Sequence, residues 1–477
     1  MLASKQLIAF LSLFNAFFSP AFARPATIQK RVLTPSQDPF YQPPSGYEDE
    51  TPGTILRQRQ VAVSYFGLIP DPVEAWQLLY RTTATNGTAI AEVTTVFKPS
   101  VNVKLDRFVD FNTAYDGAAR SGICQPSYTY QLGAVQLDLI SSVEYLLLQA
   151  FLLQGYIVSA PDYEGPDSAF AAGRLAGMGV LDSMRAVANF KSTLGLTTST
   201  PAVVGYGYSG GGIATGWAAS LQQTYAPELN IKGWASGGTP ANLTGTAQFL
   251  ENTLFSGFLP QAIVGLSAPS AFGNVLVPFL EQHATDYGKS VLETSSQICG
   301  VENLFTFEFQ SLESTKVQDF GDRLFYQTVL APVLGQEIMG VTKNITPIAP
   351  VYLYHAKNDE VITYANVSTL DNNWCDYGAQ VEFVTYANGG HATTEIIGFP
   401  GAFNFVNDAF DGNVGGACTR TTKLDDSLDP LALGVQLEPV LVHLLDALAI
   451  AGKDDVNIIN NLGNLNKTIP VGNSTSS

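Results

Sequence analysis

The feature that most constrains the fold is a glycine-rich turn between a predicted strand and a predicted helix. The pentapeptide Gly207-Tyr208-Ser209-Gly210-Gly211 follows a strand expected at residues 202–205 and precedes a helix expected at residues 212–225. Small residues beside the serine allow the tight strand-turn-helix geometry that holds a nucleophilic serine in an exposed, strained conformation. Because a bare Gly-x-Ser-x-Gly string is weak evidence, the flanking elements carry the prediction of a nucleophile at Ser209. The alternative is an incidental serine in a glycine-rich turn.

Strands and helices alternate along the chain on both sides of this turn. Short apolar segments predict strands at residues 156–160, 351–354 and 381–386, and helical patterns cover residues 142–154 and 179–194. Two further β-like segments flank a turn within residues 75–96. Strands separated by helices of this length predict an α/β-hydrolase fold, in which a mostly parallel sheet has helices on both faces.

The alternation stops at residues 240–337. This segment is rich in Phe, Leu and Gly, and its helical patches have no clear strands between them. It predicts a mainly helical cap or lid inserted into a core of residues 32–239 and 338–477, since sites in open α/β sheets lie at the carboxyl ends of the strands. The alternative is an ordinary helical layer of the core. One cluster of apolar residues has two interpretations, a lid surface that contacts lipid or ordinary buried core. The cluster consists of Phe249, Leu250, Leu254, Phe255, Phe258 and Leu259.

The first residues predict secretion. Lys5, an apolar run at residues 7–18 and the small-residue pattern ending at Ala23 indicate a signal peptide at residues 1–23, with a short propeptide at 24–31 ending in Lys30-Arg31. The apolar run is too short for a transmembrane anchor, which needs about 20 residues. Six N-glycosylation sequons fit an extracellular chain and begin at Asn86, Asn242, Asn344, Asn366, Asn466 and Asn473.

The net charge and the cysteines limit which partners and cofactors we expect for this chain. A net charge of −18 argues against nucleic acid and anionic membranes, and we expect a soluble monomer. The four cysteines suit disulfides in an oxidising compartment, but they allow three pairings and their spacing does not choose among them. No Cys-x-x-Cys spacing occurs, so we predict neither a metal site nor a cofactor.

A nucleophilic serine needs a histidine to take its proton, and the chain has four. His283 lies in the expected cap, His443 in an amphipathic helix, and His355 on the same short element as the candidate acids. In α/β-hydrolases the order along the chain is Ser, acid, His, with the histidine in a loop after a strand. Elimination therefore favours His391, which follows the strand at 381–386 across four loop residues.

The acid of such a site closes a strand that precedes the histidine. Asp359 follows the strand at 351–354, with Glu360 as the adjacent competitor and Asp371 as a weaker one. The acid holds the correct imidazole tautomer and stabilises the imidazolium. We predict Asp359 for this role.

The oxyanion hole needs two donors. The first is predicted to be the backbone N–H of Gly210, the residue after the nucleophile. The second should come from a loop after an early strand, which residues 112–117 provide. No His-Gly-Gly-Gly motif occurs there, and the residues alone do not choose the donor.

At this point the motifs resemble the fungal secretory lipase family typified by Candida antarctica lipase A. The resemblance runs from residue 38 to about residue 416 and includes long strings in order, among them Tyr80-Arg81-Thr82-Thr83, Cys124-Gln125-Pro126-Ser127-Tyr128, Asp162-Tyr163-Glu164-Gly165, Tyr225-Ala226-Pro227-Glu228-Leu229-Asn230 and Ala409-Phe410-Asp411-Gly412. After Leu424 the chain departs from the family pattern, and residues 429–453 predict a leucine-rich helix where the family has a flap.

The resemblance implies a triad of Ser209, Asp359 and His391, in agreement with the choice made from the residues. It also implies that Asp116 joins the Gly210 amide in the oxyanion hole, and that the lid falls near residues 240–335. The family's disulfides would correspond to Cys124 with Cys299 and Cys375 with Cys418.

We therefore expect a secreted serine hydrolase of carboxylic esters that cleaves acylglycerols or related fatty-acid esters at a lipid–water interface. The alternative is an esterase that deacetylates a small secreted metabolite, such as an acetylated terpenoid toxin of the trichothecene type. A peptidase would use the same triad, but no feature of the sequence favours it. A catalytically silent binding protein would usually lack a triad member, and all three are present here.

Overall fold

The computed structural model describes residues 32–424. The expected signal peptide and propeptide lie outside the described residues. So do the predicted helix at 429–453, His443 and the sequons at Asn466 and Asn473.

The main sheet positions the site. Among the described residues it has ten strands in the order β1-β4-β5-β7-β6-β8-β9-β10-β11-β12, and the seven strands from β7 to β12 in this order are mutually parallel. Their bounds are β1 Ile55–Val61, β4 Glu74–Thr83, β5 Ala89–Lys98, β6 Arg107–Asn112, β7 Ile157–Pro161, β8 Ala202–Tyr208, β9 Ile231–Gly237, β10 Val351–Ala356, β11 Val381–Tyr386 and β12 Thr419–Lys423. A separate pair, β2 Ser64–Tyr65 and β3 Ile69–Pro70, is antiparallel.

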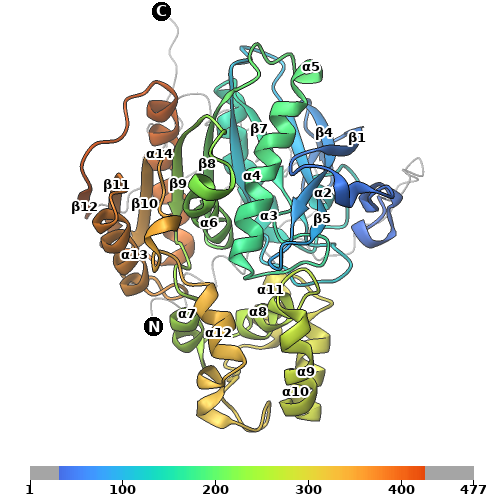
Figure 1. The fold of residues 1–477 in the computed structure, drawn as a ribbon, viewed down its shortest axis with the longest axis vertical. Coiled ribbons are helices and arrows are strands. Elements are labelled where there is room, and N and C mark those ends of the chain that lie inside the picture. The colour runs from blue at the N-terminus through green and yellow to red at the C-terminus, as the bar shows by residue number, and fades with distance from the viewer. Residues whose placement is uncertain (1–31, 425–477) are drawn as a thin grey trace, which may run out of the picture. The chain divides into compact units, whose positions relative to one another are not determined.

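Helices cover both faces of this sheet (Figure 1). The helices around it are α2 Pro126–Thr129, α3 Leu139–Leu153, α4 Gly173–Asn189, α5 Lys191–Leu194, α6 Gly210–Tyr225, α13 Tyr364–Asp376 and α14 His391–Phe410. The rings of Phe151 in α3 and Phe399 in α14 meet on one face, together with Tyr206 of β8. On the other face α4 packs against α6 so closely that a Cβ on Gly177 would lie 2.7 Å from the backbone of Trp217. The predicted α/β-hydrolase fold is confirmed.

The observed elements differ from the predicted ones mainly at their ends. The helix predicted at 179–194 begins earlier, at Gly173, and divides at Phe190 into α4 and α5. The helix predicted at 142–154 also begins earlier, as α3, where the side chain of Asp138 accepts a hydrogen bond from the backbone N–H of Ile140 at 3.2 Å. Such N-capping fixes a helix start more strongly than apolar periodicity does.

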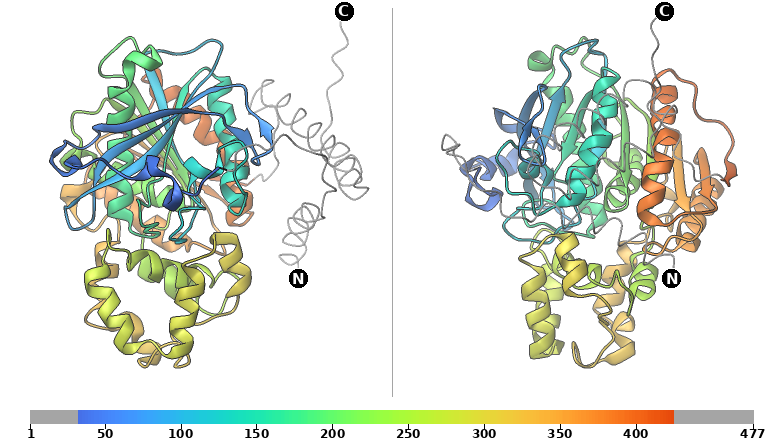
Figure 2. Two further views of the ribbon diagram at one scale, coloured as in Figure 1. Left: turned by 90° about the vertical axis from the view of Figure 1, so that its right-hand side faces the viewer. Right: turned by 180° about the vertical axis from the view of Figure 1, so that it is seen from behind.

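Between β9 and β10 the chain adds no strand to the main sheet. Instead it forms the helices α7 Leu243–Leu250, α8 Phe258–Leu266, α9 Gly273–His283, α10 Asp286–Ser295, α11 Gly300–Thr306 and α12 Leu330–Gln336. We call residues 243–336 the helical insertion. Figures 1 and 2 show it as a separate layer at one end of the sheet. Its function as a cap, and the domain boundaries given above, stay predictions.

Two disulfides tie distant segments together. Cys124 bonds to Cys299, which joins the segment after β6 to the helical insertion, and Cys375 bonds to Cys418 between α13 and β12. These are the pairs that the family resemblance implies. Within residues 32–424 we find no helix with the length and apolarity needed to cross a bilayer.

Candidate active site

Ser209 lies between β8 and α6 in a strained backbone conformation. Its φ is 53° and its ψ is −119°, a region that costs free energy for any residue with a Cβ. The backbone N–H of Ser209 donates to Gly237 O at 3.0 Å. The flanking glycines are required by space, since a Cβ on Gly207 would lie 2.3 Å from Gly211 O. The sharp turn lifts the hydroxyl to the carboxyl end of the sheet, as the pentapeptide predicts.

His391 lies next to this hydroxyl. The distance between His391 Nε2 and Ser209 Oγ is 2.7 Å, and the imidazole is almost buried. Two side chains hold the backbone of His391. Tyr208 Oη donates to His391 O at 2.7 Å, and the N–H of His391 donates to Glu360 Oε2 at 3.0 Å. As predicted, His391 follows β11 across residues 387–390, and it is the first residue of α14. A helix start fixes an imidazole more rigidly than an open loop.

Asp359 completes the hydrogen-bonded chain. Its Oδ2 is 2.7 Å from His391 Nδ1, and its Oδ1 accepts the backbone N–H groups of Val361 at 2.9 Å and Ile362 at 2.7 Å. Burial alone would raise the pKa of this carboxyl, but the charge and hydrogen bond of His391 outweigh it and hold the pKa below the ordinary value. Asp359 therefore stays ionised at physiological pH.

The two competing acids lie elsewhere. Glu360 contacts the backbone N–H of His391 and not its ring. Asp371 pairs with Arg420 at the far edge of the sheet. Within the described residues, the structure thus brings Asp359 alone of the three into contact with the imidazole.

His355 is a member of the site that sequence reasoning set aside. Its Nε2 lies 3.0 Å from Ile362 O and 3.4 Å from Asp359 Oδ2, and its side chain is fully buried. Burial lowers its pKa, which favours the neutral imidazole, so Nε2–H can donate to the carbonyl that follows the acid. Its spacing of four residues before Asp359 was the available signal. By contrast, His283 ends α9 and pairs with Asp319 at 3.1 Å.

Asp116 faces the nucleophile from the segment after β6. A Cβ on Gly210 would lie 1.7 Å from Asp116 Oδ1, so this oxygen is directly beside the residue that follows Ser209. Asp116 has a positive φ of 39°, is buried, and its Oδ1 has no hydrogen-bond partner among the described residues. Gln261 of α8 donates its side-chain N–H to Asp116 O. Desolvation raises the pKa of Asp116 to about 7, although nearby His391 opposes this.

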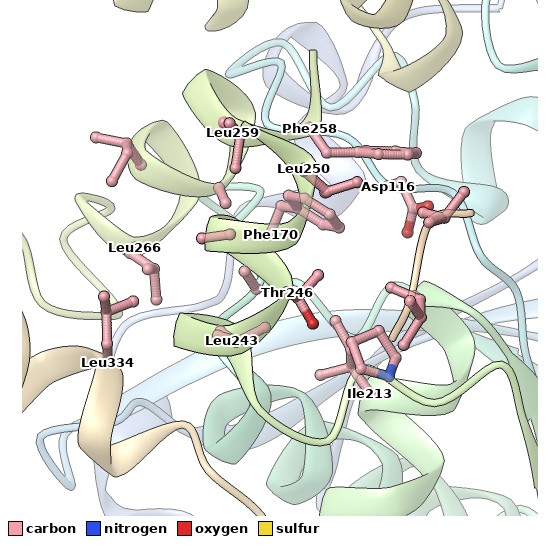
Figure 3. A pocket seen from close by; sticks show the side chains of 18 of the residues that line it. Asp116, Phe170, Ile213, Leu243, Thr246, Leu250, Phe258, Leu259, Leu266 and Leu334 are labelled. Carbon is pink, nitrogen blue, oxygen red and sulfur yellow. The ribbon is translucent and has the colours of Figure 1, made fainter. Parts of the chain in front are cut away.

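An apolar cavity of about 690 Å³, partly open to solvent, begins at Ser209, Gly210 and Asp116. Most of its wall comes from the helical insertion, and Figure 3 shows those side chains surrounding one space with Asp116 at its side. The insertion contributes Leu243, Thr246, Ala247, Leu250, Phe258, Leu259, Ala262, Ile263, Leu266, Leu312, Phe325 and Leu334. Such a wall fits an apolar substrate chain. In the part of the chain described, no group of three or more His, Cys, Asp and Glu side chains is arranged to hold a metal ion.

The four described sequons differ in exposure. Asn86 and Asn344 are exposed, whereas Asn242 and Asn366 are half-buried. The Nδ2 atom of Asn366, which would carry a glycan, is buried. We therefore expect glycans at Asn86 and Asn344 and none at Asn366.

The sheet, the turn at Ser209 and the hydrogen-bonded Ser, His and Asp side chains define an α/β-hydrolase. Comparison with known proteins gives the family. The model of the secretory lipase family matches residues 131–416, and the chain belongs to this family. It is a secreted carboxylic-ester hydrolase, as predicted from the sequence.

Individual relatives cover most of the chain. The secreted triacylglycerol lipase LIP2 of Malassezia furfur is 37% identical over 434 residues, which is 90% of this chain and 91% of the relative. The secreted triacylglycerol lipase LIP3 of Malassezia restricta is 40% identical over 384 residues, 80% of each chain. The crystal structure of Candida antarctica lipase A superposes with a TM-score of 0.78 at 31% identity, covering 87% of this chain and 96% of that one.

Proposed function

We propose that this protein hydrolyses triacylglycerols and related long-chain fatty-acid esters, with Ser209, His391 and Asp359 as its catalytic triad. The observation that carries the proposal is the apolar cavity that leads from Ser209 into the helical insertion. The names of the Malassezia relatives support the substrate class.

The geometry supports acyl transfer to Ser209. Ser209 Oγ attacks the ester carbonyl while His391 Nε2 takes its proton, and Asp359 stabilises the imidazolium that forms. His391 then protonates the departing alcohol, which leaves an acyl-enzyme. Water, deprotonated by His391, attacks the acyl-enzyme, and the proton returns to Ser209 Oγ as the fatty acid is released.

Two groups are placed to stabilise the tetrahedral oxyanion. The N–H of Gly210 begins α6, where the helix dipole also favours negative charge. Asp116 would repel an oxyanion as a carboxylate but would stabilise it as a carboxylic acid that donates a hydrogen bond. Because burial raises its pKa to about 7, Asp116 holds its proton at acidic and near-neutral pH.

The exposed aromatic side chains of the helical insertion support action at a lipid surface. They are Phe249, Tyr287, Phe305, Phe309 and Tyr326. The backbone N–H of Phe309 donates to Thr253 O at 2.8 Å, and Gln248 donates to Tyr326 Oη at 3.4 Å, so segments carrying three of these rings adjoin the end of α7. With a net charge of −18, an uncharged lipid surface suits the protein better than an anionic membrane. We propose that it acts there as a monomer.

This surface differs from the predicted lid cluster. Leu250 and Leu259 are buried, Phe255 packs partly buried against the core, and Phe258 lines the cavity. Only Phe249 of that cluster is strongly exposed. The core interpretation therefore fits most of these residues, because a helical insertion over an apolar cavity needs apolar side chains on its inner face as well.

The first experiment compares rates on acetyl, butyryl and oleoyl esters, with Ser209→Ala as the control. We expect the highest kcat/KM on oleoyl esters, and a loss in kcat of about 10⁴ to 10⁶ in the alanine variant with an unchanged melting temperature. Preference for the acetyl ester would overturn the substrate class and favour the small-metabolite esterase. A variant that kept a tenth of the rate, or a wild-type Ser209 that no phosphonate labels, would overturn the mechanism.

The lipid surface is tested by Phe305→Ser together with Phe309→Ser. Both side chains are at least half exposed, so we expect unchanged melting and unchanged turnover of a soluble short-chain ester, but weaker activity on emulsified trioleoylglycerol. Phe255→Ser is the matched control for a packing residue and should lower the melting temperature. Equal activity of the double variant on emulsion would remove this surface from the mechanism.

A further inference from the structure

Two glutamates that the mechanism above does not use meet behind the site. The side chains of Glu144 of α3 and Glu395 of α14 face each other and act on each other's ionisation. Figure 2 shows α3 and α14 on the same face of the sheet. Glu144 is fully buried and Glu395 is half-buried, and Oε1 of each glutamate is shielded from solvent and accepts no hydrogen bond from the described residues.

Two ionised carboxylates cannot hydrogen-bond to each other, because each is an acceptor only. A proton on one of the pair supplies the donor that their two Oε1 atoms otherwise lack, and burial favours this state. Burial raises the pKa of Glu144 and of Glu395, and for Glu144 the adjacent charge of Glu395 adds to the effect. Loss of the last shared proton would leave two anions facing each other in an interior with few donors.

The pair joins the two sides of the candidate active site. Glu144 Oε2 accepts the backbone N–H of Ala114 at 2.6 Å, two residues before Asp116. Glu395 lies one helical turn after His391, and its charge acts on both His391 and Asp116. The contact between the two glutamates thus links the segment that carries Asp116 to the helix that carries the imidazole.

Few other ionisable groups act on the two glutamates. Asp116 and His391 are the ionisable groups of the site that act on it directly. The remaining titratable neighbours, which follow α2 and β7 or lie on β8 and β10, are tyrosines whose pKa is raised by burial, so they stay neutral: Tyr130, Tyr163, Tyr206, Tyr208 and Tyr354. Around the imidazole itself, Asp359 and Glu360 are the other acidic groups.

We propose that Glu144 and Glu395 share one proton and act as positioning residues that hold the Asp116 segment against the His391 helix and set the negative charge facing the imidazole. The proposal rests on the proposed function of His391 as the base. In the native pair one negative charge is divided between the two carboxyls. A glutamine at either position donates a permanent hydrogen bond and confines the charge to the remaining glutamate.

The two glutamine variants therefore have opposite consequences. Glu395→Gln moves the charge to Glu144, away from His391, so the pKa of the imidazole falls. Glu144→Gln confines the charge to Glu395, so the pKa of the imidazole rises. His391 must be neutral to act as a base. The acid limb of the kcat/KM profile should therefore move to lower pH in Glu395→Gln and to higher pH in Glu144→Gln, each by about half a pH unit to one unit.

The experiment measures this profile on a soluble p-nitrophenyl ester in wild type and both variants. Glu337→Gln is the matched control, because Glu337 is a fully buried glutamate of raised pKa that binds the start of α4 and does not act on His391. Opposite shifts in the two variants and none in the control support the proposal. Shifts in the same direction, or none, overturn it, even if melting temperatures change.

Two safeguards keep the test decisive. If Glu395→Gln does not fold, Glu144→Gln decides, and an unmoved or lowered acid limb there overturns the proposal. Phosphonate labelling of Ser209 separates this result from a failure of the proposed function. Labelled wild type with unshifted variants rejects the glutamate pair alone, whereas an unlabelled and inactive wild type rejects the catalytic assignment.

Discussion

Two carboxyl groups flank His391, and the structure gives them opposite environments. Asp359, after β10, accepts two backbone N–H groups and contacts the imidazole, and its pKa lies below the ordinary value. Asp116, after β6, is buried beside an apolar cavity with Oδ1 unpartnered, and its pKa is raised to about 7. The same residue type is therefore an anion on one side of the site and a neutral acid on the other.

The difference shows that the charge of a close partner together with its hydrogen bond, and not burial alone, sets the pKa of a carboxyl in this protein. Both groups are at most 5% exposed. At Asp359 the charge and hydrogen bond of His391 outweigh burial, with two backbone N–H groups as further donors, whereas at Asp116 burial outweighs the charge of His391 and Oδ1 has no partner among the described residues. When two environments push the pKa values of two carboxyls in opposite directions, one site has both an anion and a proton donor at the same pH.

The largest expected effect tests the Asp359 side. Asp359→Asn places an amide where the imidazolium needs a negative charge and stabilises the wrong tautomer, so kcat should fall about 10⁴-fold. Glu360→Gln is the matched control and should cost far less, because Glu360 contacts only the backbone of His391. Steady-state kinetics on a short-chain ester decide this, and the reverse order of effects would make Glu360 the acid.

The Asp116 side should respond differently to the same change. Asn keeps a donor and tolerates the positive φ of this position, so Asp116→Asn should retain activity within about tenfold. Asp116→Ala removes the donor and should lower kcat about 10² to 10³-fold. The wild-type rate should also fall as pH rises above about 7 with loss of the Asp116 proton, and Asn should abolish that fall. An asparagine variant as impaired as alanine would show that Asp116 acts as an anion.

The last expected effect is on stability and not on the rate of catalysis. Burial raises the pKa of Asp110, Asp116, Asp162 and Glu337 to about 7. Between pH 4 and 7 the folded state keeps protons that the unfolded chain has released, so stability is greatest at acidic pH and falls as pH rises through about 7. Asp359 acts in the opposite sense, since its lowered pKa costs stability only below about pH 4.

Thermal melting between pH 4 and 9 checks this balance. The melting temperature should be higher at pH 5 than at pH 8. A maximum at pH 8 would mean that these buried carboxyls are ionised in the folded protein, and it would remove the contrast between Asp116 and Asp359.

Several features were predictable because they depend on neighbours in the chain. The strand, turn and helix around Ser209 follow from local glycine spacing, and β11 has the bounds that its apolar pattern predicts. The order of nucleophile, acid and histidine, with only four histidines in the chain, was enough to select His391. Elements with strong local signals form wherever tertiary packing does not oppose them.

Other features depended on contacts between distant segments. No local pattern indicates that Glu360 binds the backbone of His391 or that α14 begins at His391. The exposed rings of the helical insertion also differ from the aromatic cluster that the sequence makes conspicuous.

The sequence by itself predicted the sheet and selected Ser209 and His391 as the candidate nucleophile and base, because backbone geometry and residue order encode them. Tertiary structure alone decided which carboxyls of this site are charged. Asp116, Glu144 and Asp359 carry the same functional group, but only Asp359 is hydrogen-bonded to the distant His391, whereas burial dominates at Asp116 and at Glu144. Since the free energy of ionisation depends on burial and donors and not on residue type alone, that distinction could not be made before the fold was known.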